Sequence, residues 1–212
     1  MSSSPTPRGQ LFVVSAPSGT GKTTLVESLV ASMPHLRMSR SYTSRQARVG
    51  EVDGVDYNFV SRQRFEAMIA GDQFLEWADI YGDLYGTSQV DTERIQSEGD
   101  DLVLVIDVQG ARKIRRRGVP VVSVFVMPPA LDVLESRLRG RSTDSEAQIQ
   151  RRLEVAREEV RAFHEYEFVV VNDEVGEAVE RLRSIVTAAR LTLAATTPAA
   201  QRIAATFSVG EE

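Results

Sequence analysis

The stretch LFVVSAPSGTGKTTLVESLV, residues 11–30, constrains the fold of this chain more than any other. Its first residues are apolar and β-branched and predict a buried strand, a glycine-rich turn follows, and the periodic apolar residues after the turn predict a helix. A strand, a glycine-rich turn and a helix in this order make a phosphate-binding loop, or P-loop, because the backbone N–H groups at the helix N-terminus face phosphate oxygens. The sequence therefore predicts a nucleoside-triphosphate site on an α/β core.

Individual positions of the turn have separate tasks. Lys22 reaches the β- and γ-phosphates, and the Thr23 hydroxyl is a ligand for Mg²⁺. Ala16 stands where the usual pattern begins with glycine, so its φ must be negative, whereas the two later glycines are present. The expected ATP-binding residues are Ala16, Pro17, Ser18, Gly19, Thr20, Gly21, Lys22, Thr23 and Thr24.

Further apolar runs predict the rest of a parallel sheet. LVLVI begins at Leu102, VVSVFV at Val121 and FVVV at Phe168, and RMSRSY at Arg37 supplies a fifth strand. Continuous apolar runs suit strands that are buried on both faces, and helical patterns separate these runs along the chain. The predicted fold class is α/β, with a parallel sheet flanked by helices.

Capping residues and glycines mark the predicted helices. One helix spans 21–32, and another follows Ser61 and ends at Gly71. Thr143 and Glu146 have the spacing of a capping box, ahead of a helix whose apolar residues are Ile149, Leu153, Ala156, Val160 and Phe163. A last amphipathic helix contains Val179, Leu182, Val186 and Leu193.

Composition narrows the classes of function. The 212 residues have room for one α/β domain with small insertions, and the net charge of -5 argues against a protein whose main partner is nucleic acid. The chain has no cysteine, which excludes disulfides, thiolate zinc sites and cysteine nucleophiles and suits a reducing compartment. The apolar run after the polar start is too short for a signal peptide or a membrane span. We expect a soluble, cytoplasmic protein.

Two segments interrupt the alternation of strands and helices. Residues 41–91 hold short alternating pieces, several glycines and aromatics, and the only tryptophan, Trp77. Residues 132–157 are rich in arginine and contain the sequence RLRGRSTDSE. We expect two small insertions over one core, which suits two flaps that close over a single site.

Asp107 directly follows the strand LVLVI and precedes VQG. In P-loop enzymes an acidic residue at the end of a neighbouring strand helps to position Mg²⁺ and its waters. An Asp at this place also caps the following turn with its side chain, and the sequence leaves both interpretations open. The basic stretch ARKIRRRG, which includes Lys113, is interpreted as a solvated helix face.

The stretch SYTSRQARVGEVDGVDYNF, residues 41–59, gathers groups that suit a phosphate. Arg45 and Arg48 lie three residues apart, and two guanidinium forks with nearby hydroxyls can converge on one phosphate. The alternative is an ordinary surface pair, because arginine is the default cation of this chain. The nearby hydroxyls belong to Ser41, Tyr42 and Tyr57.

Farther along the same insertion, FLEWADIYGDLYGTS supplies Glu76 and Thr87. Guanine presents a ring N–H and an amine side by side, next to a carbonyl. A carboxylate accepts from both donors, and a hydroxyl donates to the carbonyl. The pair therefore suits recognition of a guanine base.

Five motifs together carry a family resemblance: SAPSGTGKTT, TSRQARVGEVDGVDYNF, FLEWADIYGDLYGTS, VIDVQGA and RLRGRSTDSEAQIQRRL. In order and separation they closely resemble guanylate kinases, which phosphorylate GMP to GDP with ATP. The resemblance covers residues 11–193. It implies phosphoryl transfer from ATP to GMP with Mg²⁺, with these small molecules as partners and neither nucleic acid nor a membrane involved.

The resemblance also implies residue roles. The residues that match the family's GMP site are Ser41, Arg45, Arg48, Glu51, Tyr57, Tyr85, Glu76, Thr87 and Asp107. Asn172 matches a motif near the adenine of ATP, and Thr23 and Asp107 would hold the metal. The catalytic set would be Lys22, Arg45, Arg137, Arg141 and Arg152, of which the last three match lid arginines.

The implied architecture is a discontinuous P-loop core with two insertions. The core comprises residues 10–40, 92–131 and 158–195, the GMP-binding subdomain residues 41–91, the small helical lid residues 132–157, and a tail residues 196–212. The chain departs from the family's usual residues, without loss of a phosphate-binding group, at Ser44, Ala47, Val105 and Ser142.

Two alternatives stay open at this point. A non-catalytic guanylate-kinase-like binding module typically has a damaged phosphate loop, whereas GTGKT is intact here. Another nucleoside monophosphate kinase would read a different base, and Glu76 argues against adenine because a carboxylate repels its acceptor nitrogen. Oligomeric state and the use of dGMP are left open.

Overall fold

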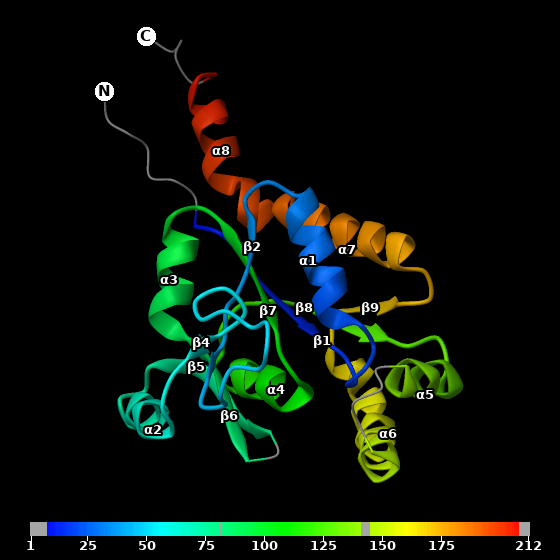
Figure 1. Ribbon diagram of the computed structural model, residues 1–212. Helices are drawn as coiled ribbons and strands as arrows, with labels where there is room; N and C mark the ends of the chain where they lie inside the picture. The colour runs from blue at the N-terminus through cyan, green and yellow to red at the C-terminus, as the bar shows by residue number, and fades with distance from the viewer. Residues whose placement is uncertain (1–7, 81, 141–144, 208–212) are drawn as a thin grey trace.

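Two sheets organise the chain in the computed structural model, which describes residues 8–80, 82–140 and 145–207 (Figure 1). The larger sheet is parallel throughout and has the strand order β2-β7-β1-β8-β9. Its strands are β1 (Leu11–Ser15), β2 (Leu36–Met38), β7 (Asp101–Val105), β8 (Val122–Met127) and β9 (Phe168–Val171). The predicted parallel sheet is confirmed, including its fifth strand near Arg37.

Helices cover both faces of this sheet, and the side chains of β1 alternate between them. Phe12 and Val14 pack against one pair of helices, and Leu11 and Val13 pack against the layer on the opposite face. The first pair is α1 (Lys22–Ser32) and α7 (Val175–Arg190). The opposite layer is α3 (Gln89–Ser97), α4 (Val108–Arg116) and the 3₁₀ helix η1 (Arg161–Glu165).

Strand β9 departs from the expectation of burial on both faces. It is the last strand of the sheet, and three of its four residues are exposed, with Val170 alone buried. An edge strand has a neighbour on one side only, so an apolar run does not guarantee burial there.

The second sheet lies within residues 42–88 and has the order β4-β3-β6-β5. Its strands are β3 (Tyr42–Thr43), β4 (Asn58–Phe59), β5 (Phe74–Ile80) and β6 (Asp83–Ser88). Helix α2 (Arg62–Ala70) begins after Ser61, whose side chain accepts from the Arg64 N–H, and its C-cap is Gly71. The segment has a small core of its own, formed by Phe65, Met68, Phe74 and Leu84.

Helices α5 (Leu131–Arg139) and α6 (Glu146–Val160) form a third unit. Their shared core is Leu134, Leu138, Ile149, Leu153 and Ala156. The capping box at the start of α6 is formed by Ser145 and Gln148, so the predicted pairing of Thr143 with Glu146 is wrong; Thr143 lies outside the described residues. Phe163 is exposed because the α-helix ends at Val160 and a 3₁₀ turn follows.

The predicted last helix is in fact two helices. Val179, Leu182 and Val186 are buried on α7 as expected, but Leu193 begins α8 (Leu193–Ala205) and is 80% exposed. The break follows from Thr192, whose side chain caps α8 by accepting from the Ala195 N–H. Helix α8 extends away from the body of the molecule (Figure 1). Among the described residues, no helix is both long and apolar enough to span a membrane.

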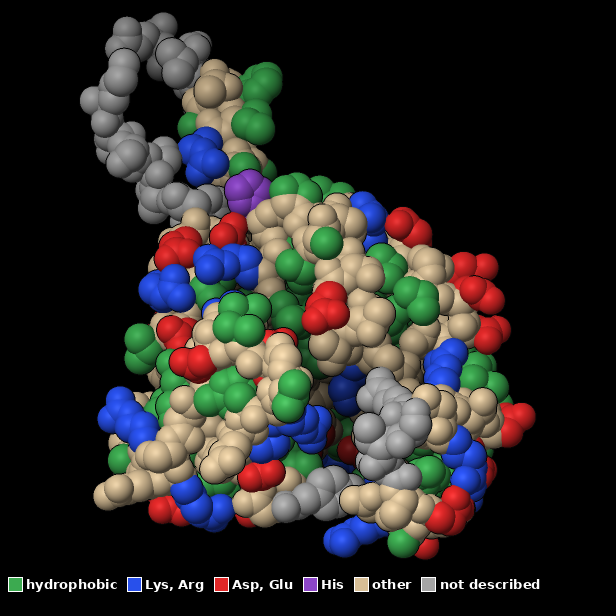
Figure 2. All heavy atoms as spheres, in the orientation of Figure 1, with side chains coloured by type: hydrophobic (Ala, Val, Ile, Leu, Met, Phe, Trp, Pro, Cys, Tyr) green, Lys and Arg blue, Asp and Glu red, His purple; other side chains and the backbone are tan. Residues whose placement is uncertain are grey.

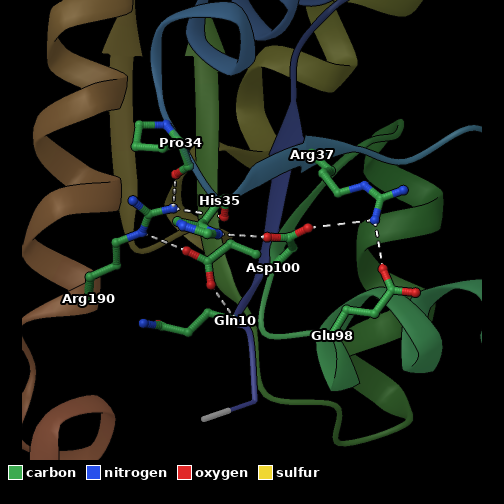
Figure 3. A network of polar contacts seen from close by, with 8 residues as sticks. Gln10, Pro34, His35, Arg37, Glu98, Asp100 and Arg190 are labelled. Atoms are coloured by element: carbon green, nitrogen blue, oxygen red, sulfur yellow. Dashed lines mark hydrogen bonds and ion pairs between the residues drawn. The ribbon is translucent and has the colours of Figure 1, made fainter. Parts of the chain in front are cut away.

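A polar network closes the amino ends of the strands, shown in Figure 3. Asp101, at the start of β7, accepts from the Gln10 backbone N–H at 2.6 Å and from Arg190 Nε at 2.8 Å. Arg190 also donates to the backbone carbonyls of Pro34 and His35. The network joins α7 to the strand ends and leaves the carboxyl ends to the candidate site.

Candidate active site

The candidate site lies where β1 and β7 end side by side, which is where parallel α/β sheets bind ligands. The P-loop joins β1 to α1, and Asp107 follows β7; Ser15 Oγ donates to the Asp107 carbonyl at 3.4 Å. Figure 2 shows Lys and Arg side chains beside the hollow that separates the α2 subdomain from α5 and α6.

Two glycines give the P-loop its shape. Gly19 has φ 91° and Gly21 has φ 90°, a region that side-chain-bearing residues rarely adopt. A Cβ at Gly19 would also lie 2.6 Å from Leu138 Cδ2 on α5. Ala16 is buried with no positive φ, as the sequence requires. As the N-cap of α1, Gly21 brings no side-chain cap, so backbone N–H groups at this helix end suit phosphate oxygens.

Lys22 is the first residue of α1, and its ammonium group turns back onto the loop. Its Nζ donates to the Ala16 carbonyl at 2.6 Å. Burial lowers the pKa of Lys22, while the negative charges of Glu159 and Asp107 raise it. The cation is therefore held beside the loop by a backbone carbonyl, and the charges of two carboxylates favour it.

Asn172 contacts the P-loop, and Arg137 contacts Asn172. Asn172 follows β9 and is buried, and its Nδ2 donates to the Thr20 carbonyl at 2.7 Å. Arg137, on α5, donates to the Asn172 carbonyl at 3.0 Å. Asn172, which was expected near the adenine, and Arg137, which was expected in a lid, thus contact each other through the Asn172 backbone carbonyl.

Helix α6 reaches the loop at Ser18. Arg152 Nη2 donates to Ser18 Oγ at 2.7 Å, and Glu159 accepts from the Ser18 backbone N–H. Arg141, the remaining arginine expected in a lid, lies outside the described residues. Thr23 and Thr24 are exposed in the first turn of α1.

On the other side of the hollow, Arg45 is the centre of a cluster. Its guanidinium contacts both carboxylate oxygens of Glu51, at 2.8 and 2.9 Å, and its Nε donates to Tyr85 Oη at 3.1 Å. Its Cζ lies 5.5 Å from the centroid of the Tyr57 ring. Four of the residues expected at the GMP site thus meet, although they come from two separate stretches of sequence.

Other residues expected here are placed differently. Arg48 joins through its backbone N–H, which donates to Glu51 Oε2 at 2.7 Å, and the residue is exposed. The Tyr42 hydroxyl turns away and donates to Asp91 Oδ2 at 3.2 Å. Ser41 is half-buried just before β3, and its carbonyl accepts from the Asn58 N–H.

Glu76 and Thr87 form a buried pair between the two strands β5 and β6. They face each other across the strands, and Thr87 Oγ1 donates to Glu76 Oε1 at 2.7 Å. The register shifts between Phe74 and Glu76, which lets both Leu75 and Glu76 face α4. The irregularity aims the carboxylate out of the subdomain core and toward the neighbouring helix.

Asp107 is the N-cap of α4, and its Oδ1 accepts from the Gly110 N–H at 2.7 Å. The capping interpretation is therefore confirmed, and a carboxylate has further lone pairs for other partners. A Cβ on Gly110 would lie 2.8 Å from Glu76 Oε2 and 3.2 Å from Asp107 Oδ1. The missing side chain at Gly110 lets two carboxylates share this corner.

Burial raises the pKa of Glu76 to about 7, and the Asp107 charge adds to this effect. The hydrogen bond from Thr87 and the charge of Lys113 act in the opposite direction. Burial disfavours the charged form of this carboxylate, and hydrogen-bond donors from a ligand would stabilise that form.

The donor set near the P-loop fits Mg²⁺. The Thr23 hydroxyl and the Asp107 carboxylate are oxygen donors, the kind of group that this cation prefers, and Mg²⁺ usually binds one or two carboxylates together with substrate phosphates. Within the described parts of the chain, no three His, Cys, Asp or Glu side chains gather as an all-protein metal site.

Two residues near the site were not identified from the sequence as functional. Glu159 lies seven residues after Arg152, on the same face of α6, and this helical spacing was the available signal. Lys113 was assigned to a solvated face, but its ammonium group lies 4.4 Å from the centroid of the Trp77 ring. The exposed arginines 112 and 115 of the same helix pair with Glu165, as a solvated face does.

Comparisons with known proteins identify the family of the chain. The family model described as guanylate kinase matches residues 8–189. The guanylate kinase of Neisseria meningitidis serogroup A is 50% identical over 184 residues, 87% of this chain and 90% of the relative. That of Methylococcus capsulatus is 47% identical over 93% of this chain and 97% of the relative. The crystal structure of guanylate kinase from Anaplasma phagocytophilum matches with a TM-score of 0.70 and 32% identity, over 88% of each chain.

Proposed function

The chain belongs to the guanylate kinase family and transfers a phosphoryl group from ATP to GMP, and from this premise we propose how its side chains divide the reaction. We infer that the triphosphate lies on the P-loop and that Lys22 moves from the Ala16 carbonyl to the phosphates. The uncapped N-terminus of α1 and the lysine beside it support this assignment.

We propose that GMP lies in the second sheet, with its phosphate at Arg45. The bidentate contact of Arg45 with Glu51 supports this role. The two guanidinium N–H groups that bind the carboxylate oxygens of Glu51 can bind two phosphate oxygens in the same way. Tyr57, Tyr85, Ser41 and Arg48 complete the proposed phosphate site. On this basis we assign residues 41–91 to GMP binding and residues 132–157 to a lid. Residues 196–212 form a tail outside the site. The remaining segments, 10–40, 92–131 and 158–195, form the core.

No general base is needed in this mechanism. The nucleophile is a phosphate oxygen of GMP, which is largely ionised near neutral pH because the second phosphate pKa is about 6. The protein has to bring two anions into line and to stabilise charge on the transferring group. Lys22, Arg45, Arg137, Arg141 and Arg152 supply positive charge for that task in our proposal.

We propose Mg²⁺ as the metal, held by Thr23 and Asp107, where it would neutralise charge on the ATP phosphates. GDP formation should therefore need a divalent cation, which is tested by adding excess chelator and then restoring Mg²⁺. Equal turnover in chelator would contradict the proposal. The substrates are intracellular nucleotides, and a cysteine-free chain suits a reducing compartment, so we propose a cytoplasmic enzyme.

The buried Glu76–Thr87 pair is the observation that supports guanine reading best. Glu76 would accept from two guanine donors, whereas AMP would leave it facing an acceptor nitrogen. A site that hydrogen-bonds its substrate can reject a mismatched analogue by roughly 10⁴-fold. Glu76→Gln should therefore lose activity with GMP, and the difference in kcat/KM between GMP and AMP should become smaller.

The test measures kcat/KM for GMP and AMP in the wild type and in Glu76→Gln. Gln keeps the size of the side chain, so the GMP-to-AMP ratio isolates the carboxylate. An unchanged ratio in two folded proteins would disprove guanine reading by Glu76. A wider panel with dGMP, UMP and dTMP defines the range of acceptors.

A further inference from the structure

The strand that carries Glu76 lies at an open edge. In the order β4-β3-β6-β5, strand β5 pairs with β6 alone, so its outer edge has no strand neighbour in the described sheet. Edge strands are less constrained than central ones. A fixed position of Glu76 for contact with a guanine base therefore needs a stabilising contact on β5 in addition to its pairing with β6.

Helix α4 supplies that contact. Its N-cap Asp107 and its residues Gly110 and Lys113 are spaced at three-residue intervals and so lie on one face. Gly110 lies against the Glu76 carboxylate, and one turn farther along Lys113 reaches the next residue of β5. The Lys113 ammonium group donates to the Trp77 carbonyl and lies 4.4 Å from the centroid of the Trp77 ring.

These contacts differ from those of the other basic residues on α4. Arg112 and Arg115 are exposed and pair with Glu165, and Arg116 is exposed and donates to a carbonyl of its own helix. Lys113 is half-buried and holds both the backbone and the ring of one residue on another element. A compact ammonium group suits this space between a ring face and a carbonyl.

We propose that Lys113 is a positioning residue for GMP, because its grip on Trp77 fixes the edge of β5 and thereby holds Glu76 in place for the guanine base. The inference rests on the proposed guanine contact of Glu76. It predicts that loss of Lys113 weakens binding of GMP and leaves binding of ATP unchanged, because the P-loop lies on another element.

The test compares Lys113→Met, which keeps the apolar stem, with Arg116→Met as the matched control on the same helix. Trp77 is the only tryptophan of the chain, so its emission reports directly whether the contact is lost. Dissociation constants for GMP and ATP come from titration calorimetry. In Lys113→Met we expect an altered Trp77 emission, a roughly tenfold weaker GMP affinity and an ATP affinity within about twofold, with Arg116→Met unchanged.

The same variants in the Glu76→Gln background separate the two hypotheses. If Lys113 acts through Glu76, its replacement should add less than about twofold once Glu76 is changed. An equal tenfold loss in both backgrounds, or a GMP affinity within about twofold of wild type despite an altered Trp77 emission, would overturn the role of Lys113. A Glu76→Gln protein with normal GMP affinity would instead refute the guanine contact itself. Should Lys113→Met not fold, Lys113→Gln replaces it with the same expectations.

Discussion

Buried charge distinguishes the candidate site at the scale of single residues. Burial lowers the pKa of Lys22 and raises the pKa values of Glu76 and Glu159, whereas Arg139 and Glu146 form an exposed pair between α5 and α6. Charges taken out of water cost free energy unless a partner or a ligand compensates them. Because of this cost, we expect mutations of the buried charged residues at the site to change stability and activity more than mutations of exposed charged residues.

Lys22→Ala should lower kcat by at least about a hundredfold, because it removes the cation proposed for the β- and γ-phosphates. The fold should survive, since the variant also removes a buried charge. Steady-state kinetics measure the first effect, and urea unfolding of the same preparation measures the second. A folded variant with near-normal kcat would show that another group holds the phosphates.

Glu76 should make stability depend on pH. Its pKa rises from 4.5 to about 7 on folding, so between these values the native protein binds more protons than the unfolded chain. The contribution of Glu76 to the free energy of unfolding therefore falls as pH rises through that window, by up to about 3 kcal/mol.

The check for Glu76 is urea unfolding of the wild type and Glu76→Gln at about pH 5 and about pH 8. Gln stays neutral at both values, so the wild type should lose more stability than the variant on going to the higher pH. Other titrating groups are common to both proteins and cancel in the difference. Parallel pH profiles would show that Glu76 ionises normally.

At the scale of elements, α6 acts on the P-loop through two side chains. Arg152 and Glu159 are two helical turns apart and both contact Ser18, one through its hydroxyl and one through its backbone N–H. Both contacts would have to break for α6 to move relative to the loop. Such a movement would change the distance from Arg152 to phosphates bound at the loop.

Arg152→Ala should mainly lower kcat and leave the affinity for GMP unchanged, because Arg152 is proposed to meet charge that develops during transfer. Arg139→Ala is the matched control within the proposed lid, since Arg139 pairs with the exposed carboxylates of Glu135 and Glu146. Its kcat should stay near the wild-type value. A collapse of GMP affinity with normal kcat in Arg152→Ala would remove this residue from the transfer step.

At the scale of the whole molecule, the two ends of the parallel sheet have different tasks. The carboxyl ends of the strands carry the P-loop and Asp107, and the amino ends carry the network around Asp101 and Arg190 (Figure 3). Asp101 is 6% exposed and holds both the N-terminal segment and α7. We therefore expect the amino ends to govern stability without affecting the chemistry.

Asp101→Asn should lower the free energy of unfolding by about 2 to 4 kcal/mol, because it leaves a partly buried Arg190 without its counter-charge. Its kcat should be unchanged at a temperature where the variant is folded. Glu98→Gln is the control, since its pair with Arg37 is exposed and should contribute less than about 1 kcal/mol. A kcat that falls with Asp101→Asn would link the two ends of the sheet.

Much of the molecule follows from short segments of sequence. The strand, turn and helix of the P-loop and the cap at Ser61 involve residues close in the chain, so local rules predict them. Where local rules were misleading, tertiary context decided. Strand β9 is apolar but lies at an edge, and the capping box uses Ser145 in place of Thr143.

The sequence by itself determined the nucleotide-binding class, the parallel core and the identity of the candidate groups, because motif residues carry their chemistry wherever the chain folds. Only the tertiary structure decided which of them meet. Asn172 reaches the carbonyl of Thr20, Arg152 reaches Ser18, and Lys113 turns from the expected solvated face to Trp77. Contacts between residues so distant in sequence depend on strand order and helix placement, which no local pattern specifies.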